Sequence, residues 1–116
     1  SLSTHELADW SRGLATSLRA GIPMKQALKQ ASDRGSSRAR RASQAILNSL
    51  ESGQDVAGAF KENARFFPSL FVGMLSVGVQ TGHIPEVLRE LERYYRFQLT
   101  LRRKFLQQIT WPGIQL

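Results

Sequence analysis

Two histidines, His5 and His83, are the side chains in this chain best suited to acid–base or metal chemistry, because cysteine is absent. They lie far apart in the sequence, and we expect no second His, Asp or Glu at ligand spacing beside either of them. Serine and acidic residues are present, but no nucleophile–base spacing stands out. No glycine run continues into Gly-Lys-Ser or Gly-Lys-Thr, the signature of a phosphate-binding loop. We therefore predict no enzymatic activity, no metal site and no cofactor, with the histidines at surface or capping positions.

Basic residues dominate the charge of the chain, with 16 Lys and Arg against 9 Asp and Glu and a net charge of +7. This excess favours an acidic partner, which the sequence leaves open as nucleic acid, anionic lipid or an acidic protein surface. One cluster consists of four arginines: Arg34, Arg38, Arg40 and Arg41. It is interpreted either as a solvated face, as a docking face for an acidic protein, or as a nucleic-acid surface. We favour protein over nucleic acid, because the aromatic residues fall on apolar helical stripes typical of a core.

A second basic cluster, Arg102, Arg103 and Lys104, precedes Trp111 and Pro112. Basic residues beside a membrane span mark the cytoplasmic side, and Trp favours the membrane interface. The cluster is therefore either a charged chain end or a juxtamembrane segment, with residues 111–116 as the truncated start of a membrane segment. The longest apolar run, residues 66–79, is shorter than the roughly 18 to 20 residues that a span requires. No basic n-region of a signal peptide opens the chain, so we expect the chain as given to be soluble.

Six predicted helices position these clusters. Ser3 and Glu6 have the spacing of a capping box, and apolar residues then recur at steps of three and four. Asp55 and either Ser36 or Ser37 are predicted N-caps. Helix breaks are predicted at Gly21 and Pro23, at residues 33–37, at Gly53, at Pro68, and at Gly82 with Pro85. No stretch alternates with a period of two. The sequence predicts an all-α fold: a compact bundle of about six antiparallel helices over residues 1–110.

The segment from Phe66 to Val79 is the most apolar in the chain. Its apolar residues point in nearly every direction around a helix, which predicts a buried hub wrapped by the other helices. Small residues at Gly73, Ser76 and Gly78 would let a neighbouring backbone approach closely. Thr81 is expected to bond to the backbone at the end of this helix. A bundle this small leaves apolar surface that a second copy could cover, so a homodimer is one expected assembly.

An ordered set of short patterns resembles one known family. The patterns at the start are Leu14-Ala15-Thr16, Leu18, Ala20-Gly21-Ile22-Pro23 and Ala27-Leu28. Later come Gly53, Phe67-Pro68, Gly78, Thr81-Gly82 and Val87-Leu88, and then Arg102-Arg103-Lys104 followed by Trp111-Pro112. Over residues 7–114 this set resembles the type II secretion F domain, found in the inner-membrane platform proteins of type II secretion systems and type IV pilus machines. No single motif is decisive, whereas their order is fairly specific.

The resemblance implies a non-enzymatic scaffold domain on the cytoplasmic side of the bacterial inner membrane. Its implied partners are the assembly ATPase, other cytoplasmic and inner-membrane secretion components, and the pseudopilin or pilin subunits. The full-length protein would also contact the membrane. The alternative from charge alone is a basic helical nucleic-acid-binding module.

One residue departs from the family pattern. Relatives usually carry Gly-Glu-x-Ser/Thr-Gly where this chain reads Gly78-Val79-Gln80-Thr81-Gly82. Any ion pair or cation contact that the acid makes in relatives therefore does not transfer to Val79.

Overall fold

The computed structural model describes the backbone of residues 1–115 and the side chains of residues 1–109. The elements are α1 (Thr4–Arg19), α2 (Met24–Ala31), α3 (Ser37–Glu51), α4 (Val56–Glu62), a short 3₁₀ turn (Ala64–Phe66), α5 (Ser69–Thr81) and α6 (Ile84–Gln115). No strand occurs in this part of the chain. The predicted all-α class and the six predicted helices are confirmed.

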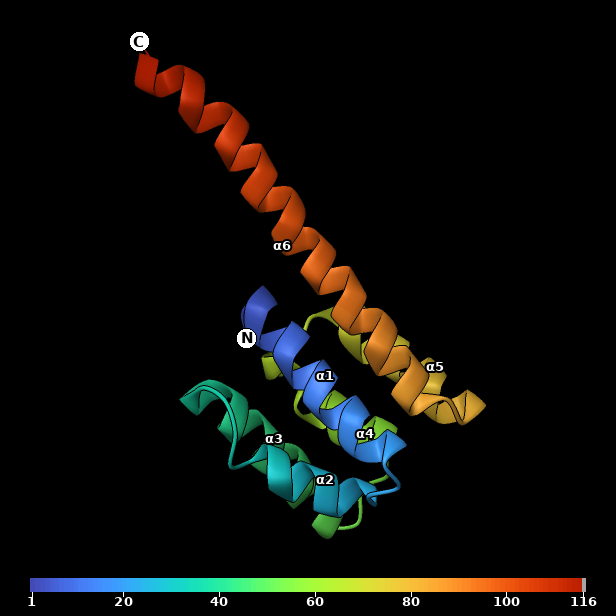
Figure 1. Cartoon of the computed structure of the whole chain (residues 1–116). Helices are drawn as coiled ribbons and strands as arrows, with labels where there is room; N and C mark the ends of the chain where they lie inside the picture. The colour runs from blue at the N-terminus through green and yellow to red at the C-terminus, as the bar shows by residue number, and fades with distance from the viewer. Residues whose placement is uncertain (116) are drawn as a thin grey trace.

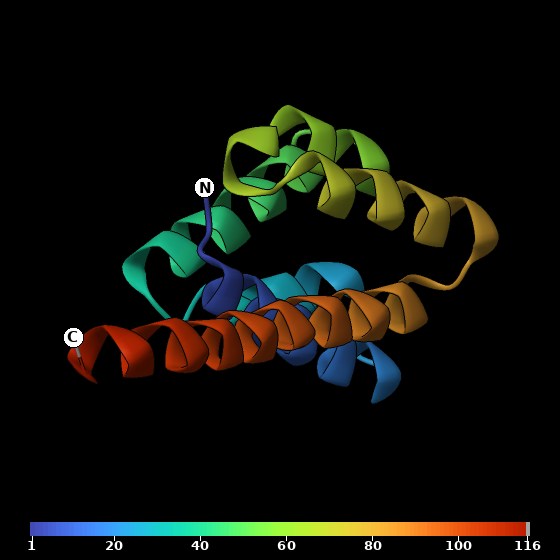
Figure 2. The same ribbon diagram turned by 90° about the horizontal axis from the view of Figure 1, so that it is seen from above.

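Helix α1 lies at the centre of the bundle, packed against α6 and also against α2 (Figure 1). Helix α6 runs antiparallel to α1 and forms a hairpin with α5. The first part of α6 lies along the bundle, whereas its second half continues beyond it (Figures 1 and 2). The molecule is therefore elongated, with principal extents of 59 × 28 × 24 Å.

The predicted helix ends are present. The Ser3 hydroxyl accepts a bond from the Glu6 backbone N–H at 3.1 Å, and the Ser3 backbone N–H donates to the Glu6 carboxylate at 2.7 Å, which completes the capping box. Ser36 and Asp55 cap α3 and α4. Pro23 and Pro68 directly precede α2 and α5, and Gly21, Gly53 and Gly82 adopt positive φ angles of 88°, 108° and 74°.

Four aromatic rings from three parts of the chain form the centre of the core. Trp10 of α1 lies 5.1 Å from Phe67 and 5.9 Å from Phe60 between ring centroids, and Phe67 stacks on Phe71 at 4.8 Å. The Trp10 indole N–H donates to the Ser43 hydroxyl of α3 at 2.8 Å. One bulky side chain of α1 thus holds α3, α4 and α5 together.

The prediction that residues 66–79 form a buried hub is wrong. In α5 only Phe71, Leu75 and Gly78 are buried, whereas Leu70 and Val77 are 46% and 50% exposed. The central helix is α1, whose buried face includes Ala8, Ser11, Ala15 and Ser17 as well as larger residues. Small residues lower the apolar content of α1 but allow close helix approach, so composition alone selected the wrong helix.

The expectation that all the aromatic residues lie on core stripes is also wrong. In α6 the residues Leu88, Leu91 and Tyr95 are buried, whereas Tyr94, Phe97 and Phe105 are 43%, 60% and 60% exposed. The reason is geometric: Tyr94 and Phe97 lie on the face of α6 turned away from the bundle, and Phe105 lies in the second half of α6, which continues beyond the bundle.

The predicted domain boundary falls inside α6, which runs without a break from Ile84 to Gln115. The side chains of Trp111 and Pro112 lie outside the described residues, so the start of a membrane segment at residues 111–116 stays a prediction. Within the described part of the chain, no helix combines the length and apolarity that crossing a membrane demands.

Candidate functional site

The arginine cluster around α3 divides into two parts. Arg34 extends over α1, with one guanidinium nitrogen 3.1 Å from where a Cβ on Gly13 would lie. Arg38 donates to the Ser1 backbone carbonyl at 2.9 Å. Arg40 and Arg41 remain exposed on α3, where Arg41 donates to the Ser37 hydroxyl at 3.1 Å. Arg34 therefore lies against the middle of α1 and Arg38 against the start of the chain, and the docking role of the four stays a prediction.

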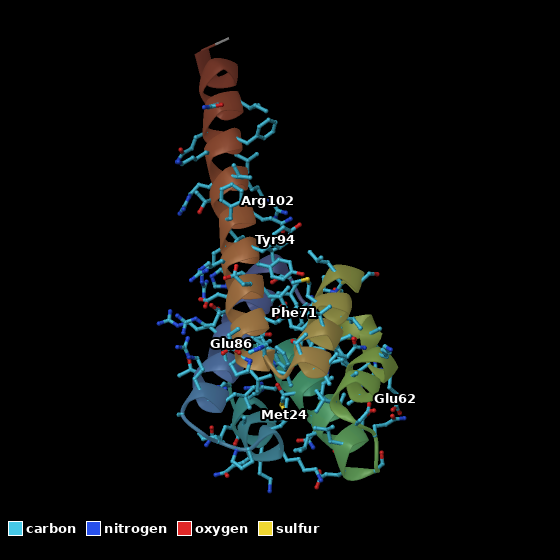
Figure 3. All side chains as sticks on the ribbon, turned by 90° about the vertical axis from the view of Figure 1, so that its right-hand side faces the viewer. Met24, Glu62, Phe71, Glu86, Tyr94 and Arg102 are labelled. Carbon is cyan, nitrogen blue, oxygen red and sulfur yellow. The ribbon has the colours of Figure 1, made fainter. Side chains whose placement is uncertain are left out.

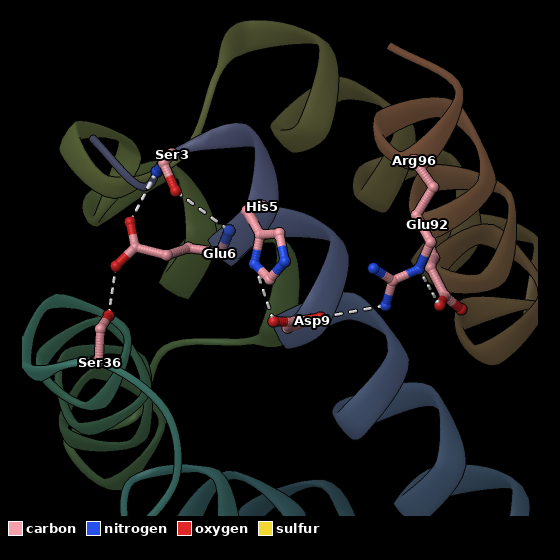
Figure 4. A network of polar contacts seen from close by, with 7 residues as sticks. All are labelled: Ser3, His5, Glu6, Asp9, Ser36, Glu92 and Arg96. Carbon is pink, nitrogen blue, oxygen red and sulfur yellow. Dashed lines mark hydrogen bonds and ion pairs between the residues drawn. The ribbon is translucent and has the colours of Figure 1, made fainter. Parts of the chain in front are cut away.

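Glu6 joins the start of α1 to the start of α3 (Figure 4). Its carboxylate accepts bonds from the Ser3 backbone N–H and from the Ser36 hydroxyl, and it lies 3.7 Å from Arg38. The bond from the Ser3 backbone and the bond from Ser36 stabilise the carboxylate, so they lower the pKa of Glu6 from its ordinary value of 4.5. Glu6 therefore caps α1 and also sets the position of α3 against α1.

Arg96 joins α6 to α1 from the opposite side of α1 (Figure 4). Its guanidinium lies 2.7 Å from the Glu92 carboxylate and 3.1 Å from that of Asp9, which His5 also contacts at 3.1 Å. The hydrogen bond with Glu92 raises the pKa of Arg96. Glu92 and Asp9 therefore share the single positive charge of Arg96.

A groove of about 370 Å³ lies between α1 and the turn that connects α2 to α3. Its lining residues are Glu6, Asp9, Trp10, Arg12, Gly13, Thr16, Ser17, Ala31, Arg34, Gly35, Ser36 and Ala39. The volume falls within the range of roughly 300 to 1,000 Å³ that is typical of ligand sites. The lining combines small apolar residues and part of an indole with two arginines and two carboxylates.

The second half of α6 presents apolar and basic residues to solvent (Figure 3). Its exposed apolar residues are Leu101, Phe105, Leu106 and Ile109, and Phe97 is exposed just before it. Arg102, Arg103 and Lys104 are exposed among them. At 1.5 Å per residue, segment 101–115 is roughly 22 Å long. The predicted juxtamembrane residues that can be placed therefore lie on the part of α6 that extends beyond the bundle.

The α5–α6 hairpin contains Gly78, Thr81 and Gly82, which follow the family pattern, and Val79, which departs from it. The Thr81 hydroxyl donates to the Val77 carbonyl at 2.8 Å, as predicted. Gly82 takes the left-handed conformation that ends α5, and the His83 backbone N–H donates to the Gly78 carbonyl at 2.8 Å. Val79, which replaces the usual acid, is half-buried in the last turn of α5. These residues shape a turn rather than a ligand site.

Each histidine has one acidic neighbour, contrary to the expectation of none. His5 lies 3.1 Å from Asp9 and His83 lies 3.7 Å from Glu86, at spacings of four and three residues. Both contacts follow from helix geometry, because residues three or four apart lie on the same face of a helix. Within the described residues, no three His, Asp or Glu side chains gather into a potential metal site.

The sequence predicted neither the groove nor a role for Arg12. Arg12 is the only basic residue in the middle of α1, and nothing in local periodicity shows that the α2–α3 turn folds beside it. A usable signal was Gly13, because a glycine inside a strongly periodic helix often marks a close approach. In this chain the approaching group is Arg34.

Comparison with known proteins identifies similar chains. A family model described as type II secretion system (T2SS), protein F, matches residues 10–116. The chain is 30% identical over 114 residues to a type II secretion system protein F of Pseudomonas aeruginosa, covering 97% of this chain and 28% of that protein. It is 31% identical over 110 residues to a type 4 fimbrial assembly protein PilC of Pseudomonas putida, covering 94% of this chain and 27% of that protein.

A third similar protein comes from Thermus thermophilus. The chain is 29% identical over 113 residues to this type IV pilus assembly protein PilC, covering 94% of this chain and 27% of that protein. The chain thus spans little more than a quarter of the length of the curated relatives it matches.

Proposed function

The chain belongs to the type II secretion system protein F family, and we propose that it is a non-enzymatic scaffold domain of an inner-membrane platform protein. In this role it docks the cytoplasmic assembly ATPase and other secretion components, and it couples them to the assembly of pseudopilin or pilin subunits. The observation that carries the proposal is the family match over residues 10–116. The names of the relatives include both secretion and pilus proteins, so the proposal covers both kinds of machine.

The geometry supports a mechanical role between a cytoplasmic partner and the membrane. The bundle offers exposed arginines around α3, which suit an acidic protein surface. Helix α6 packs on α1 through its first half and then extends away, carrying the exposed basic residues Arg102, Arg103 and Lys104. Basic residues of this kind favour the cytoplasmic face of a membrane. A force applied to the bundle would pass along this single rigid helix.

Association with the ATPase tests the central part of the proposal. We expect this chain to bind the assembly ATPase of its own machine in analytical ultracentrifugation, with weaker binding as salt rises. An unrelated hexameric ATPase serves as the control for nonspecific attraction to a basic chain. Failure of the folded chain to bind its own ATPase would contradict the docking role.

The side of the membrane can be tested in the full-length protein. Lys29 is exposed on α2, and this chain has no cysteine of its own. A Lys29→Cys variant, with any other cysteines of the full-length protein replaced by serine, should react with a membrane-impermeant maleimide only after the inner membrane is permeabilised. Labelling in intact spheroplasts would place this domain on the periplasmic side of the inner membrane.

Nucleic-acid binding is not favoured, because the family consists of secretion and pilus proteins. That alternative requires duplex binding that falls steeply with salt through counterion release. A gel shift at low salt separates the two functions, and we expect no discrete complex.

A further inference from the structure

Charged groups in the groove between α1 and the α2–α3 turn differ in how they are paired. Glu6 is bonded by Ser3 and Ser36 and lies beside Arg38, while Asp9 is paired with Arg96. Arg12 and Arg34 are exposed, and neither takes part in an ion pair or hydrogen bond with the described side chains. The two carboxylates of the lining are thus held by other groups of the chain, whereas the guanidinium groups of Arg12 and Arg34 remain available to an acidic ligand.

The floor of the groove has room for a side chain. Trp10, of which 7% is exposed, forms part of the lining, and Gly13, Ala31, Gly35 and Ala39 contribute little or no side-chain bulk. Gly13 in particular lets the Arg34 guanidinium lie low over α1, at 3.1 Å from the position of a Cβ. An apolar side chain entering beside the indole would therefore lie within reach of both guanidinium groups.

We infer that this groove is a recognition site for a short acidic peptide segment of a partner protein, with one apolar side chain on Trp10 and carboxylates on Arg12 and Arg34. Guanidinium–carboxylate pairs are strong and directional, so they set the orientation of the segment. The apolar anchor in a small pocket supplies contact area, as is common at protein interfaces.

This inference rests on the proposed function in one respect: it takes the partner to be a protein component of the same machine. It goes further by naming the groove, the two arginines and the chemistry of the segment. Arg12 was not part of the arginine face predicted from the sequence.

A random peptide library displayed on phage is the probe. Selection on this chain should enrich peptides in which Asp or Glu flanks a Leu, Ile or Phe. The double variant Arg12→Glu/Arg34→Glu should bind the selected peptides about tenfold or more weakly, because each charge-assisted bond is lost. Thr16→Trp, which fills the groove from α1 without changing charge, should reduce binding to a similar degree.

The matched control is Lys25→Glu/Lys29→Glu, which makes the same charge change on exposed residues of α2 outside the groove lining. This control should bind the selected peptides with an affinity within about twofold of that of the wild type. Circular dichroism confirms that all variants are folded. Recovery of no peptide, of basic or uncharged peptides, or of peptides that bind the Arg12/Arg34 variant equally well would overturn the inference. Binding of duplex DNA in the groove in place of the selected peptides would also overturn the inference.

The ATPase then separates this inference from the proposed function. If the chain binds acidic peptides through the groove but does not bind the ATPase, the inference about the groove is supported and the proposed docking of the ATPase is contradicted. If the ATPase binds equally well to the Arg12→Glu/Arg34→Glu variant and no acidic peptide is selected, the docking role stands and the groove inference fails.

Discussion

Gly78 of α5 lies directly against Val87 of α6. A Cβ added at Gly78 would come within 3.1 Å of the Val87 Cγ2 atom and 3.3 Å of the Ile84 Cα atom. The two helices of the hairpin therefore meet where a residue without a side chain is needed. Gly73, in the same helix, has open space around the corresponding position.

Alanine at these two glycines should have opposite effects. Gly78→Ala should lower the free energy of unfolding by about 1 to 3 kcal/mol, because the Ile84 backbone cannot move aside easily. Gly73→Ala should raise it by roughly 0.5 to 1 kcal/mol, since alanine is the better helix former. Urea unfolding of both variants measures the difference. Equal effects of the two substitutions would show that the helices do not meet at Gly78.

The hydrogen bond from the Trp10 indole to Ser43 should be important for stability. Ser43→Ala removes the acceptor and leaves a buried N–H donor unpaired, which we expect to cost about 1 to 3 kcal/mol of unfolding free energy. Ser69→Ala, at an exposed serine of α5, is the control and should change stability by no more than about 0.5 kcal/mol. Thermal and urea unfolding are the measurements. A Ser43→Ala variant as stable as the control would mean that the indole N–H has another acceptor.

The two neighbouring tyrosines of α6 should respond differently to loss of the hydroxyl. The Tyr95 hydroxyl is buried with no hydrogen-bond partner among the described residues, and burial raises the pKa of Tyr95. Tyr95→Phe should therefore leave stability unchanged or raise it by about 1 kcal/mol. Tyr94→Phe, at a side chain 43% exposed, should be close to neutral. A marked loss of stability in Tyr95→Phe would reveal a bond to the buried hydroxyl.

Stability should depend on pH through Glu6. The pKa of Glu6 is lowered in the folded chain, so its carboxylate contributes stability above the ordinary value of 4.5 and loses that contribution as the pH falls through the folded-state pKa. Glu6→Gln keeps an acceptor for Ser3 but removes the charge. The difference in unfolding free energy between the wild type and Glu6→Gln should be present at neutral pH and should shrink in acid. A difference that stays constant from pH 7 to the acid range would assign the effect to shape rather than to charge.

The exposed apolar residues of α6 offer a test of the expected homodimer. Phe97 and Phe105 are each 60% exposed, so changing both to serine should alter the unfolding free energy of the monomer by no more than about 0.5 kcal/mol. If a second copy covers this surface, the double variant should sediment as a monomer at concentrations where the wild type forms a dimer. Replacement of the exposed Val77 by serine tests whether α5 takes part. A wild type that stays monomeric at every concentration would exclude this interface.

Much of the local structure could be predicted from residue chemistry. Ser3 with Glu6, Ser36 and Asp55 cap the helices they were expected to cap, and Gly82 ends α5 in the left-handed conformation. These features depend on groups within a few residues of one another. The four arginines near α3 were also visible as a cluster, but the division between those that reach α1 and those that stay on α3 was not.

What the sequence determined by itself is therefore the helical class, the helix ends, the basic charge and the family resemblance, because each depends on local spacing or composition. Only the tertiary structure decided that α1 rather than α5 occupies the centre, since burial depends on which helices surround a segment. It also decided that Arg12, Arg34 and Trp10 line one groove, because α1 and the α2–α3 turn meet only after the chain has folded back on itself. Tertiary structure likewise decided the exposure of the apolar residues in the second half of α6. Their periodicity is that of a core helix, but this half of α6 extends beyond the bundle and no other helix covers it.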